Sequence, residues 1–228
     1  MNLLLLGKGK TGSLVAEVAR ERGHQVRAVG SAENRGAAAL TAQSLHDVDM
    51  VIDFTTPHDV VDNIKHCVAA GMNIVVGTTG WYQQIPTIRE LVEERGMGLV
   101  FAANFSVGVN LLFEAATAVA PALRQGYSGR IVERHHIHKK DKPSGTAVAL
   151  NNILRENSGG MELPIDSVRE GEIVGEHVIE LESPNDILRL EHSAKSRRGF
   201  ADGAVRAAEW LKGRKGFYDF KDIFRQLP

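Results

Sequence analysis

The sequence predicts an α/β fold, with a doubly wound parallel sheet followed by a second α+β domain built on an open mixed sheet. Two observations predict it. Short apolar runs alternate with longer amphipathic stretches up to about residue 105, as in repeated strand–helix–strand units. Beyond that point, longer strand-like segments follow one another without helices between them, which is typical of an antiparallel or mixed sheet.

The expected elements of the first part follow from their apolar patterns. Residues 3–6 form a continuous apolar run, as in a strand that is covered on both faces. Residues 12–22 place apolar side chains on one helical face and stop at Gly23. Further strands are expected at residues 26–29, 49–54, 73–76 and 98–102, with helices that end at Gly71 and Gly96.

The second part is expected to contain two helices before its long strands and one after them. Strands are expected at residues 130–136, 167–182 and 186–194, and helices at residues 109–123, 147–154 and 200–212. This change of pattern places a domain boundary near residue 105.

Composition excludes several functional classes. The 228 residues carry a net charge of −1, so the basic excess that favours nucleic-acid binding is missing. Cys67 is the only cysteine and lies in an apolar stretch, where we expect a packed core thiol. The apolar amino terminus is too short for a signal peptide, and no apolar run approaches the ~20 residues of a membrane helix. We therefore expect a soluble, cytoplasmic protein without a nucleic-acid or membrane partner.

A glycine-rich turn lies between the first strand and the first helix. It fits G-x-G-x-x-G, in which Gly7 permits a tight turn, Gly9 lets the backbone approach a pyrophosphate and Gly12 lets helix pack on strand. Glycines also end strands for conformational reasons alone, so the position at the first strand–helix junction decides the interpretation. The turn predicts a Rossmann-type dinucleotide site with candidate residues Gly7, Lys8, Gly9, Lys10, Thr11 and Gly12.

The loop after the second strand bears on the choice between NADH and NADPH. An acidic residue that binds a ribose 2′-hydroxyl is expected at the end of that strand, but Glu33 comes late. Ser31, Asn34 and Arg35 could instead receive a 2′-phosphate, and an ordinary polar loop is an equally good interpretation. The sequence therefore favours NADPH over NADH only slightly.

Three more loops are expected at the edge of the sheet where its strands end, which is where ligands of open α/β sheets bind. Their small and hydroxyl side chains suit a nicotinamide ring and its carboxamide, whereas any single one of them could be a capping turn. The candidate residues from these loops are Gly77, Thr78, Thr79, Ala102, Ala103, Asn104 and Phe105, beside the turn at residues 55–57.

The densest group of titratable residues is the segment 133–146, Glu-Arg-His-His-Ile-His-Lys-Lys-Asp-Lys-Pro-Ser-Gly-Thr. The backbone amides of Ser144, Gly145 and Thr146, at the start of an expected helix, would receive a carboxylate. Histidine and lysine beside an anion site can protonate an anionic substrate as it accepts a hydride. The segment is therefore a candidate active site.

Two other interpretations of this segment remain open. A charge-rich loop is usually a solvated surface. His135, His136 and His138 could bind zinc, but no fourth ligand is well spaced and the adjacent lysines would repel the ion, so we expect no metal.

The same segment closely resembles the signature of the 4-hydroxy-tetrahydrodipicolinate reductase family, also called dihydrodipicolinate reductases, of lysine and diaminopimelate biosynthesis. The resemblance continues through four further segments that cover most of the chain in the right order. They are residues 77–81 (Gly-Thr-Thr-Gly-Trp), 103–110 (Ala-Asn-Phe-Ser-Val-Gly-Val-Asn), 169–177 (Arg-Glu-Gly-Glu-Ile-Val-Gly-Glu-His) and 200–208 (Phe-Ala-Asp-Gly-Ala-Val-Arg-Ala-Ala).

The resemblance implies an enzyme that transfers a hydride from NAD(P)H to a cyclic dicarboxylate and yields tetrahydrodipicolinate. His135 matches the catalytic histidine of the family and Lys139 its proton-donating lysine. His136 matches a substrate-binding histidine, and Gly145 and Thr146 match the pair whose amides hold a substrate carboxylate.

The resemblance also implies an organisation for the whole chain. Residues 1–105 would bind the dinucleotide, with residues 206–228 returning to that domain. Residues 106–205 would bind substrate and build a homotetramer through their sheet.

The chain departs from the family pattern mainly near the cofactor. Its glycine turn is shorter than the more frequent G-x-x-G-x-x-G, Lys10 and Thr11 replace an Arg-Met pair, and Ile137 stands where a basic residue is frequent. The stretch between the second and third strands is also short, so these departures affect cofactor preference more than catalysis.

Two other functions would suit the same fold. One is a dinucleotide-sensing module without turnover, which would need neither His135 nor Lys139. The other is a different amino-acid dehydrogenase, from which the Pro-Ser-Gly-Thr segment at residues 143–146 distinguishes this chain.

Overall fold

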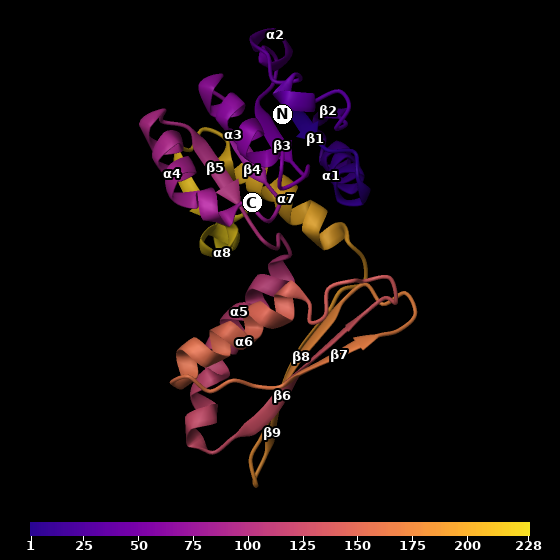
Figure 1. The fold of residues 1–228 in the computed structure, drawn as a ribbon, viewed down its shortest axis with the longest axis vertical. Coiled ribbons are helices and arrows are strands. Elements are labelled where there is room, and N and C mark those ends of the chain that lie inside the picture. Colours follow the sequence, from indigo (N-terminus) through magenta and orange to yellow (C-terminus); the bar gives the residue numbers. More distant parts are fainter. The chain divides into compact units, whose positions relative to one another are not determined.

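The computed structural model describes residues 1–228, which divide into two compact units. Unit 1 comprises Met1–Ser106 and Arg198–Pro228, and unit 2 comprises Val107–Arg197 (Figure 1). Each unit is built on a sheet of its own. Because the expected fold was a doubly wound parallel sheet plus an α+β domain on a mixed sheet, this architecture confirms the predicted fold class.

Unit 1 contains a six-stranded, all-parallel sheet in the order β10-β5-β4-β3-β1-β2. The order reverses beside β1, because the chain continues to β2 on one side and to β3 on the other. In open α/β sheets the ligand crevice lies at such a reversal, outside the carboxyl ends of the strands. The strands are β1 (Asn2–Leu6), β2 (Gln25–Val29), β3 (Met50–Asp53), β4 (Ile74–Val76), β5 (Gly98–Phe101) and β10 (Gly216–Asp219).

Both faces of this sheet are covered, which explains why its inner strands β1, β3, β4 and β5 are apolar without alternation. On one face, Leu4, Val51 and Leu99 form a core with side chains of α3 (Val60–Ala69) and α4 (Ile85–Glu94). α1 (Lys10–Glu21) packs against α7 (Arg198–Leu211), and the alternate strand residues Leu3, Leu5 and Ile52 are buried as well. Cys67 of α3 is fully buried, which confirms the predicted core thiol. The short helices of unit 1 are α2 (Ala42–Leu45) and α8 (Phe220–Ile223).

The chain returns to unit 1 at Arg198, whereas the sequence placed this return at residue 206. Residue 206 lies inside α7, and a helix that buries one continuous face cannot be divided between two cores. Gly203 in its middle packs so closely that a Cβ there would lie 1.8 Å from the carbonyl oxygen of Phe105. The whole helix therefore belongs to unit 1.

Unit 2 contains a four-stranded mixed sheet in the order β7-β6-β8-β9. β7 runs parallel to β6, and β8 and β9 are antiparallel to their neighbours. α5 and α6 lie on one side of this sheet and form its core with Ile131 and Ile179 (Figure 1). The elements are α5 (Val107–Val119), β6 (Ser128–His135), α6 (Gly145–Ser158), β7 (Ile165–Arg169), β8 (Glu176–Glu182) and β9 (Ile187–Ser193).

One helical stretch of unit 2 corrects the expectation that no apolar run approaches the length of a membrane helix. α5 and the short helix after it span Val107–Gln125, 19 residues with a mean hydropathy of 1.2, and meet the length and composition of a membrane-crossing helix. Core helices of water-soluble proteins meet the same criteria. Here Leu112, Ala116 and Ala120 are buried in the core of unit 2 beside α6.

Candidate active site

The glycine turn of unit 1 has the geometry that its sequence predicts. Gly7 has a φ of +101°, and a Cβ there would lie 2.2 Å from the carbonyl oxygen of Phe54. A Cβ on Gly12 would lie 2.1 Å from the carbonyl oxygen of Gly7, so both positions exclude a side chain. Gly9 faces open space and precedes α1, and no side chain caps that helix. The first amides of α1 are therefore available to an anion.

The turn lines a cavity of about 270 Å³ together with loops that follow two neighbouring strands. The hydroxyls of Thr11 and Thr79 and the Lys10 side chain supplement the amides of the turn, so this donor set fits a pyrophosphate. The lining residues are Gly9, Lys10, Thr11, Gly12, Phe54, Thr55, Pro57, Gly77, Thr78 and Thr79.

The loop after β5 lies at the same edge of the sheet but does not line this cavity. It contains Ala102, Ala103, Asn104 and Phe105. The Phe105 ring lies 6.2 Å from the Phe54 ring and 4.9 Å from the Phe220 ring, so it closes the core beneath the edge.

The loop after β2 contains a feature that the sequence interpretation missed. Although Glu33 comes late in the sequence, its carboxylate accepts a hydrogen bond from the amide of Gly30 at 2.7 Å. It also forms an ion pair of 2.7 Å with Lys8 of the glycine turn. Ser31 and Arg35 of the same loop are exposed. A carboxylate and two cations thus lie near the end of β2.

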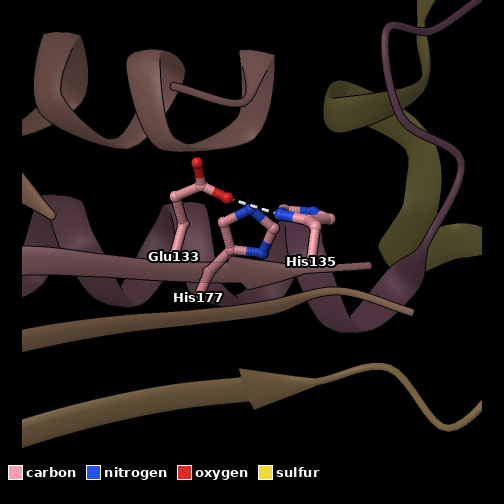
Figure 2. A group of neighbouring side chains, drawn as sticks. All are labelled: Glu133, His135 and His177. Carbon is pink, nitrogen blue, oxygen red and sulfur yellow. Dashed lines mark hydrogen bonds and ion pairs between the residues drawn. The ribbon is translucent and has the colours of Figure 1, made fainter. Parts of the chain in front are cut away.

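The chemistry of unit 2 is concentrated around a buried carboxylate at the end of β6 (Figure 2). Glu133 and His135 point to the same face of β6 because strand residues alternate, and His177 lies opposite Glu133 on β8. His135 Nδ1 pairs with Glu133 Oε2. Both terminal nitrogens of Arg169 donate to the Glu133 carboxylate, at 3.0 and 2.8 Å.

These contacts determine the protonation of His135. Burial would raise the pKa of Glu133, but hydrogen bonds from Arg169, Ser167 and His135 together hold it below its usual value. Burial lowers the pKa of His135, although Glu133 opposes this effect. A neutral imidazole that pairs with a carboxylate through Nδ1 carries its proton there, which leaves the Nε2 lone pair free.

Glu133, His135 and His177 are also ligand types that could hold a metal ion, since their donor atoms lie within 4.8 Å of one another. However, the Arg169 guanidinium occupies both carboxylate oxygens of Glu133. A cation added there would be repelled by a neighbouring positive charge, so this donor set does not fit a metal.

The loop after β6 contains the predicted histidine and lysine residues. Lys139 is partly buried, and its Nζ lies 2.8 Å from Asp141 Oδ1. His136 Nε2 lies 3.3 Å from the guanidinium of Arg197. His138 and Lys140 are exposed. The His138 ring lies 6.2 Å from the ring of His136, and its Nε2 lies 4.0 Å from Glu172.

Ser144 connects the carboxylate cluster to the start of α6. Its hydroxyl accepts a hydrogen bond from the amide of Ala147, which caps the helix, and pairs with His177 Nε2 at 3.0 Å. Its own amide donates to Glu133 Oε1 at 3.3 Å. Gly145 and Thr146 then form the first turn of α6, where amides point away from the helix and favour an anion.

Four members of this site were given no role from the sequence: Glu133, Arg169, His177 and Arg197. The period of a strand could have indicated Glu133, since it lies two residues before His135. Arg169 and His177 reach the site through strand pairing, which local sequence does not encode.

Comparisons with known proteins agree over the whole chain. The model for "Dihydrodipicolinate reductase, N-terminus" matches residues 1–105, and that for "Dihydrodipicolinate reductase, C-terminus" matches residues 108–224. The chain belongs to the dihydrodipicolinate reductase family. The 4-hydroxy-tetrahydrodipicolinate reductase of Christiangramia forsetii is 36% identical over 242 aligned positions, which cover 100% of this chain and 99% of that protein. The protein of the same name from Neisseria meningitidis is 39% identical over 81% of this chain and 74% of its own length.

Solved structures show the same fold. Dipicolinate-bound dihydrodipicolinate reductase from Paenisporosarcina sp. TG-14 superposes with a TM-score of 0.81 at 21% identity and covers 98% of this chain and 99% of that one. An amine dehydrogenase from Mycobacterium smegmatis has a TM-score of 0.64 at 11% identity over 100% and 96% of the two chains. As a member of the dihydrodipicolinate reductase family, this chain is an oxidoreductase that uses a nicotinamide dinucleotide and a small-molecule substrate.

Proposed function

We propose that this chain reduces 4-hydroxy-tetrahydrodipicolinate to tetrahydrodipicolinate in lysine and diaminopimelate biosynthesis. The observation that carries the proposal is a group of side chains in unit 2. In it, Glu133 holds a neutral His135 at the end of β6, and the loop that follows this strand contains Lys139 and leads into the first turn of α6. This group supplies an anion site and an ammonium group within one short segment. The curated relatives that match the chain are named for the same reaction.

Unit 1 would hold the dinucleotide, which supplies the hydride when bound. The amides of Gly9 and of the first turn of α1 would bind the pyrophosphate. Thr78 and Thr79, with the loop at residues 102–105, would orient the nicotinamide at the edge of the sheet.

Unit 2 would hold the dicarboxylate. The amides of Gly145 and Thr146 would bind one carboxylate at the positive end of α6, and the Ser144 cap fixes the direction of that first turn. His136 and the neighbouring Arg197 would bind the other, because a guanidinium recognises a carboxylate with two parallel hydrogen bonds.

Lys139 would deliver the proton that accompanies hydride transfer. Its Nζ is an ammonium group held by Asp141, whose own backbone oxygen accepts from Arg169. His135 would present its Nε2 to the substrate. The contact with Glu133 fixes that orientation, so the imidazole does not have to reorient during the reaction.

For the dinucleotide, we propose a modest preference for NADPH. Lys8 already neutralises Glu33, which reduces repulsion of a 2′-phosphate, and the exposed Arg35 adds a positive charge in the same loop. Titration of the protein with NADH and with NADPH in separate calorimetric experiments tests this directly. Tighter binding of NADH would contradict it.

We also propose that the protein acts in the cytoplasm as a homotetramer built through the sheet of unit 2. The face of that sheet opposite α5 and α6 carries both apolar and charged side chains and could serve as the subunit interface.

The reaction is tested by following the absorbance of NADPH or NADH with freshly generated product of the preceding synthase. We expect dinucleotide oxidation that depends on substrate. We also expect inhibition by dipicolinate, the planar dicarboxylate bound to the Paenisporosarcina protein. Folded protein that binds a dinucleotide yet oxidises neither one with this substrate would overturn the proposal.

A further inference from the structure

A buried carboxylate at the end of β3 is not used by the mechanism above. Asp53 is fully buried, and its contacts are hydrogen bonds from neutral groups without a neighbouring cation. Burial raises the pKa of this carboxyl, while hydrogen bonds from Thr78, Thr55 and Asn63 oppose that change. A buried ionisable group without a counter-ion is costly to a fold, so its position calls for an explanation.

The hydrogen bonds of Asp53 lead to residues that line the dinucleotide cavity. Its Oδ1 accepts from the Thr78 hydroxyl at 2.6 Å, and from the amide and the hydroxyl of Thr55 at 2.9 and 2.8 Å. Thr55 and Thr78 belong to the loops after β3 and β4, and both line the cavity. The backbone ladder between β3 and β4 ends with the bond from the Gly77 amide to the Asp53 carbonyl, and one carboxylate oxygen joins the two loops beyond that point.

The other oxygen leads to the loop after β2. Asp53 Oδ2 accepts from Asn63 Nδ2 at 2.7 Å, and Asn63 Oδ1 accepts from Asn34 Nδ2 at 2.9 Å. Asn34 Oδ1 in turn accepts from the amide of Ala39 at 3.2 Å. Asn34 and Asn63 are both buried. This relay ends beside Arg35, where the proposed 2′-phosphate site lies.

We infer that Asp53 is a positioning residue of the dinucleotide site, which sets the loops after β2, β3 and β4 relative to one another through Thr55, Thr78 and the Asn63–Asn34 relay. The inference rests on the proposed function, because it assumes that this cavity binds a dinucleotide. Each donor in the relay faces an acceptor. If one acceptor is replaced by a donor, the hydrogen bonds on both sides of it must therefore rearrange.

The direction of the relay allows a sharp test. In the Asp53→Asn variant the new amide nitrogen faces Asn63 Nδ2, and two donors then meet in a buried place. The double variant Asp53→Asn with Asn63→Asp restores the order. The amide nitrogen at position 53 can donate to the new carboxylate at 63, which still accepts from Asn34.

Asn73 provides a matched control in the same unit. It lies just before β4, at the amino ends of the strands and so away from the cavity. Its side-chain oxygen accepts a hydrogen bond from the amide of Gly98, and its side-chain nitrogen donates to the carbonyls of Leu211 and Arg214. In the Asn73→Asp variant a carboxylate oxygen faces the carbonyl oxygens of Leu211 and Arg214, so acceptors meet acceptors, but none of these contacts reaches the cavity. It therefore reports what loss of stability alone does to binding.

The experiment is calorimetric titration of the full-length protein with NADPH and NADH, without substrate, at a temperature where all variants are folded. We expect Asp53→Asn to raise both dissociation constants about tenfold, as expected when a buried donor loses its acceptor. We expect the double variant to return within about threefold of wild type and Asn73→Asp to remain within about twofold, although both lower the melting temperature.

Each outcome has one meaning. If Asp53→Asn binds like wild type, if the double variant is not rescued, or if Asn73→Asp weakens binding as much, the inference is overturned. If the wild-type protein itself binds neither dinucleotide, the proposed function fails instead. The same titration therefore separates the two failures.

Discussion

Glu133 is a buried carboxylate that touches both halves of the proposed substrate site. It holds His135 through Nδ1, and it accepts from the amide of Ser144, which caps α6. Arg169 compensates its charge with two hydrogen bonds. A single side chain thereby links the orientation of the imidazole to the position of the carboxylate-binding turn.

Replacing Glu133 with Gln tests this link. Only one oxygen then remains for Arg169, His135 and the Ser144 amide, and the imidazole can adopt the other tautomer. We expect kcat to fall about 10- to 100-fold, while the dinucleotide dissociation constant is unchanged because that cavity lies in unit 1. Glu180→Gln on β8, which removes partly exposed ion pairs with Arg130 and Arg189, serves as the control and should keep kcat. Unchanged kcat in Glu133→Gln would contradict the role.

Lys139 and Lys140 are adjacent lysines in different surroundings. Lys139 is held by Asp141 and is partly buried, whereas Lys140 is exposed. We expect Lys139→Met to lower kcat by about 10²- to 10⁴-fold, because the proton must then come from water. Lys140→Met should remain within about twofold of wild type by the same steady-state assay. Equal losses in the two variants would show that the loop's charge matters and not the position of one ammonium group.

Among the elements, the boundary between what sequence could and could not predict follows the range of the interactions. The strands expected at residues 3–6 and 98–102 are β1 and β5, of which β5 ends one residue earlier at Phe101, because burial on both faces leaves a local apolar run. The strand expected at residues 167–182 is two strands, β7 and β8, which pair with opposite edges of β6. Local composition does not show which edge a strand will join.

The same limit applies to the site. The glycine turn and the segment around His135 are continuous in sequence, and the turn excludes side chains at Gly7 and Gly12 as its pattern predicts. Arg169 and the Asp53–Asn63 pair depend on strand register and on a helix packed over a strand end. No spacing in one sequence encodes those contacts.

β8 carries a histidine that makes the stability of unit 2 depend on pH. Burial lowers the pKa of His177 to about 4, with a further contribution from His135. An unfolded histidine has a pKa of about 6.5, so between these values the unfolded chain binds a proton that the folded chain does not. Stability is therefore full above about pH 6.5 and falls as the pH drops toward about 4, by roughly 3 kcal/mol at most.

Urea unfolding at a series of pH values checks this expectation. We expect the free energy of unfolding of wild type to drop more steeply between about pH 6.5 and 4 than that of His177→Phe, which retains an aromatic side chain but cannot titrate. The difference between the two curves removes the contribution of the other acidic groups and histidines. Parallel curves would show that His177 is not held neutral in the folded protein.

At the scale of the whole molecule, the two proposed ligands, the dinucleotide and the dicarboxylate, bind to residues of different units. The dinucleotide cavity is lined by residues of unit 1, and the carboxylate cluster belongs to unit 2. The chain passes between the units at residues 106–107 and again at 197–198. Arg197 is thus the last residue of unit 2, and α7 of unit 1 begins with the next residue. A variant in unit 1 should therefore change the affinity for the dinucleotide more than the affinity for the dicarboxylate, and a variant in unit 2 should do the opposite.

The sheet of unit 2 also bears on assembly, because its two faces differ. Ile131 and Ile179 face the core with α5 and α6, so Val132 points to the opposite face, where Ile187 of β9 is 67% exposed. Arg130 and Glu180 pair on that same face. Uncovered faces that combine apolar and charged side chains are typical of subunit interfaces.

We expect the wild-type protein to have the mass of four chains in light scattering. A double variant, Val132→Asp with Ile187→Asp, places two charges on the uncovered face and should yield smaller species, because an interface cannot bury unpaired carboxylates. Leu111→Asp alters another exposed apolar residue, on α5 at the covered side of the sheet, and should remain tetrameric. A tetramer that survives the double variant, with circular dichroism showing native folding, would place the interface elsewhere on the molecule.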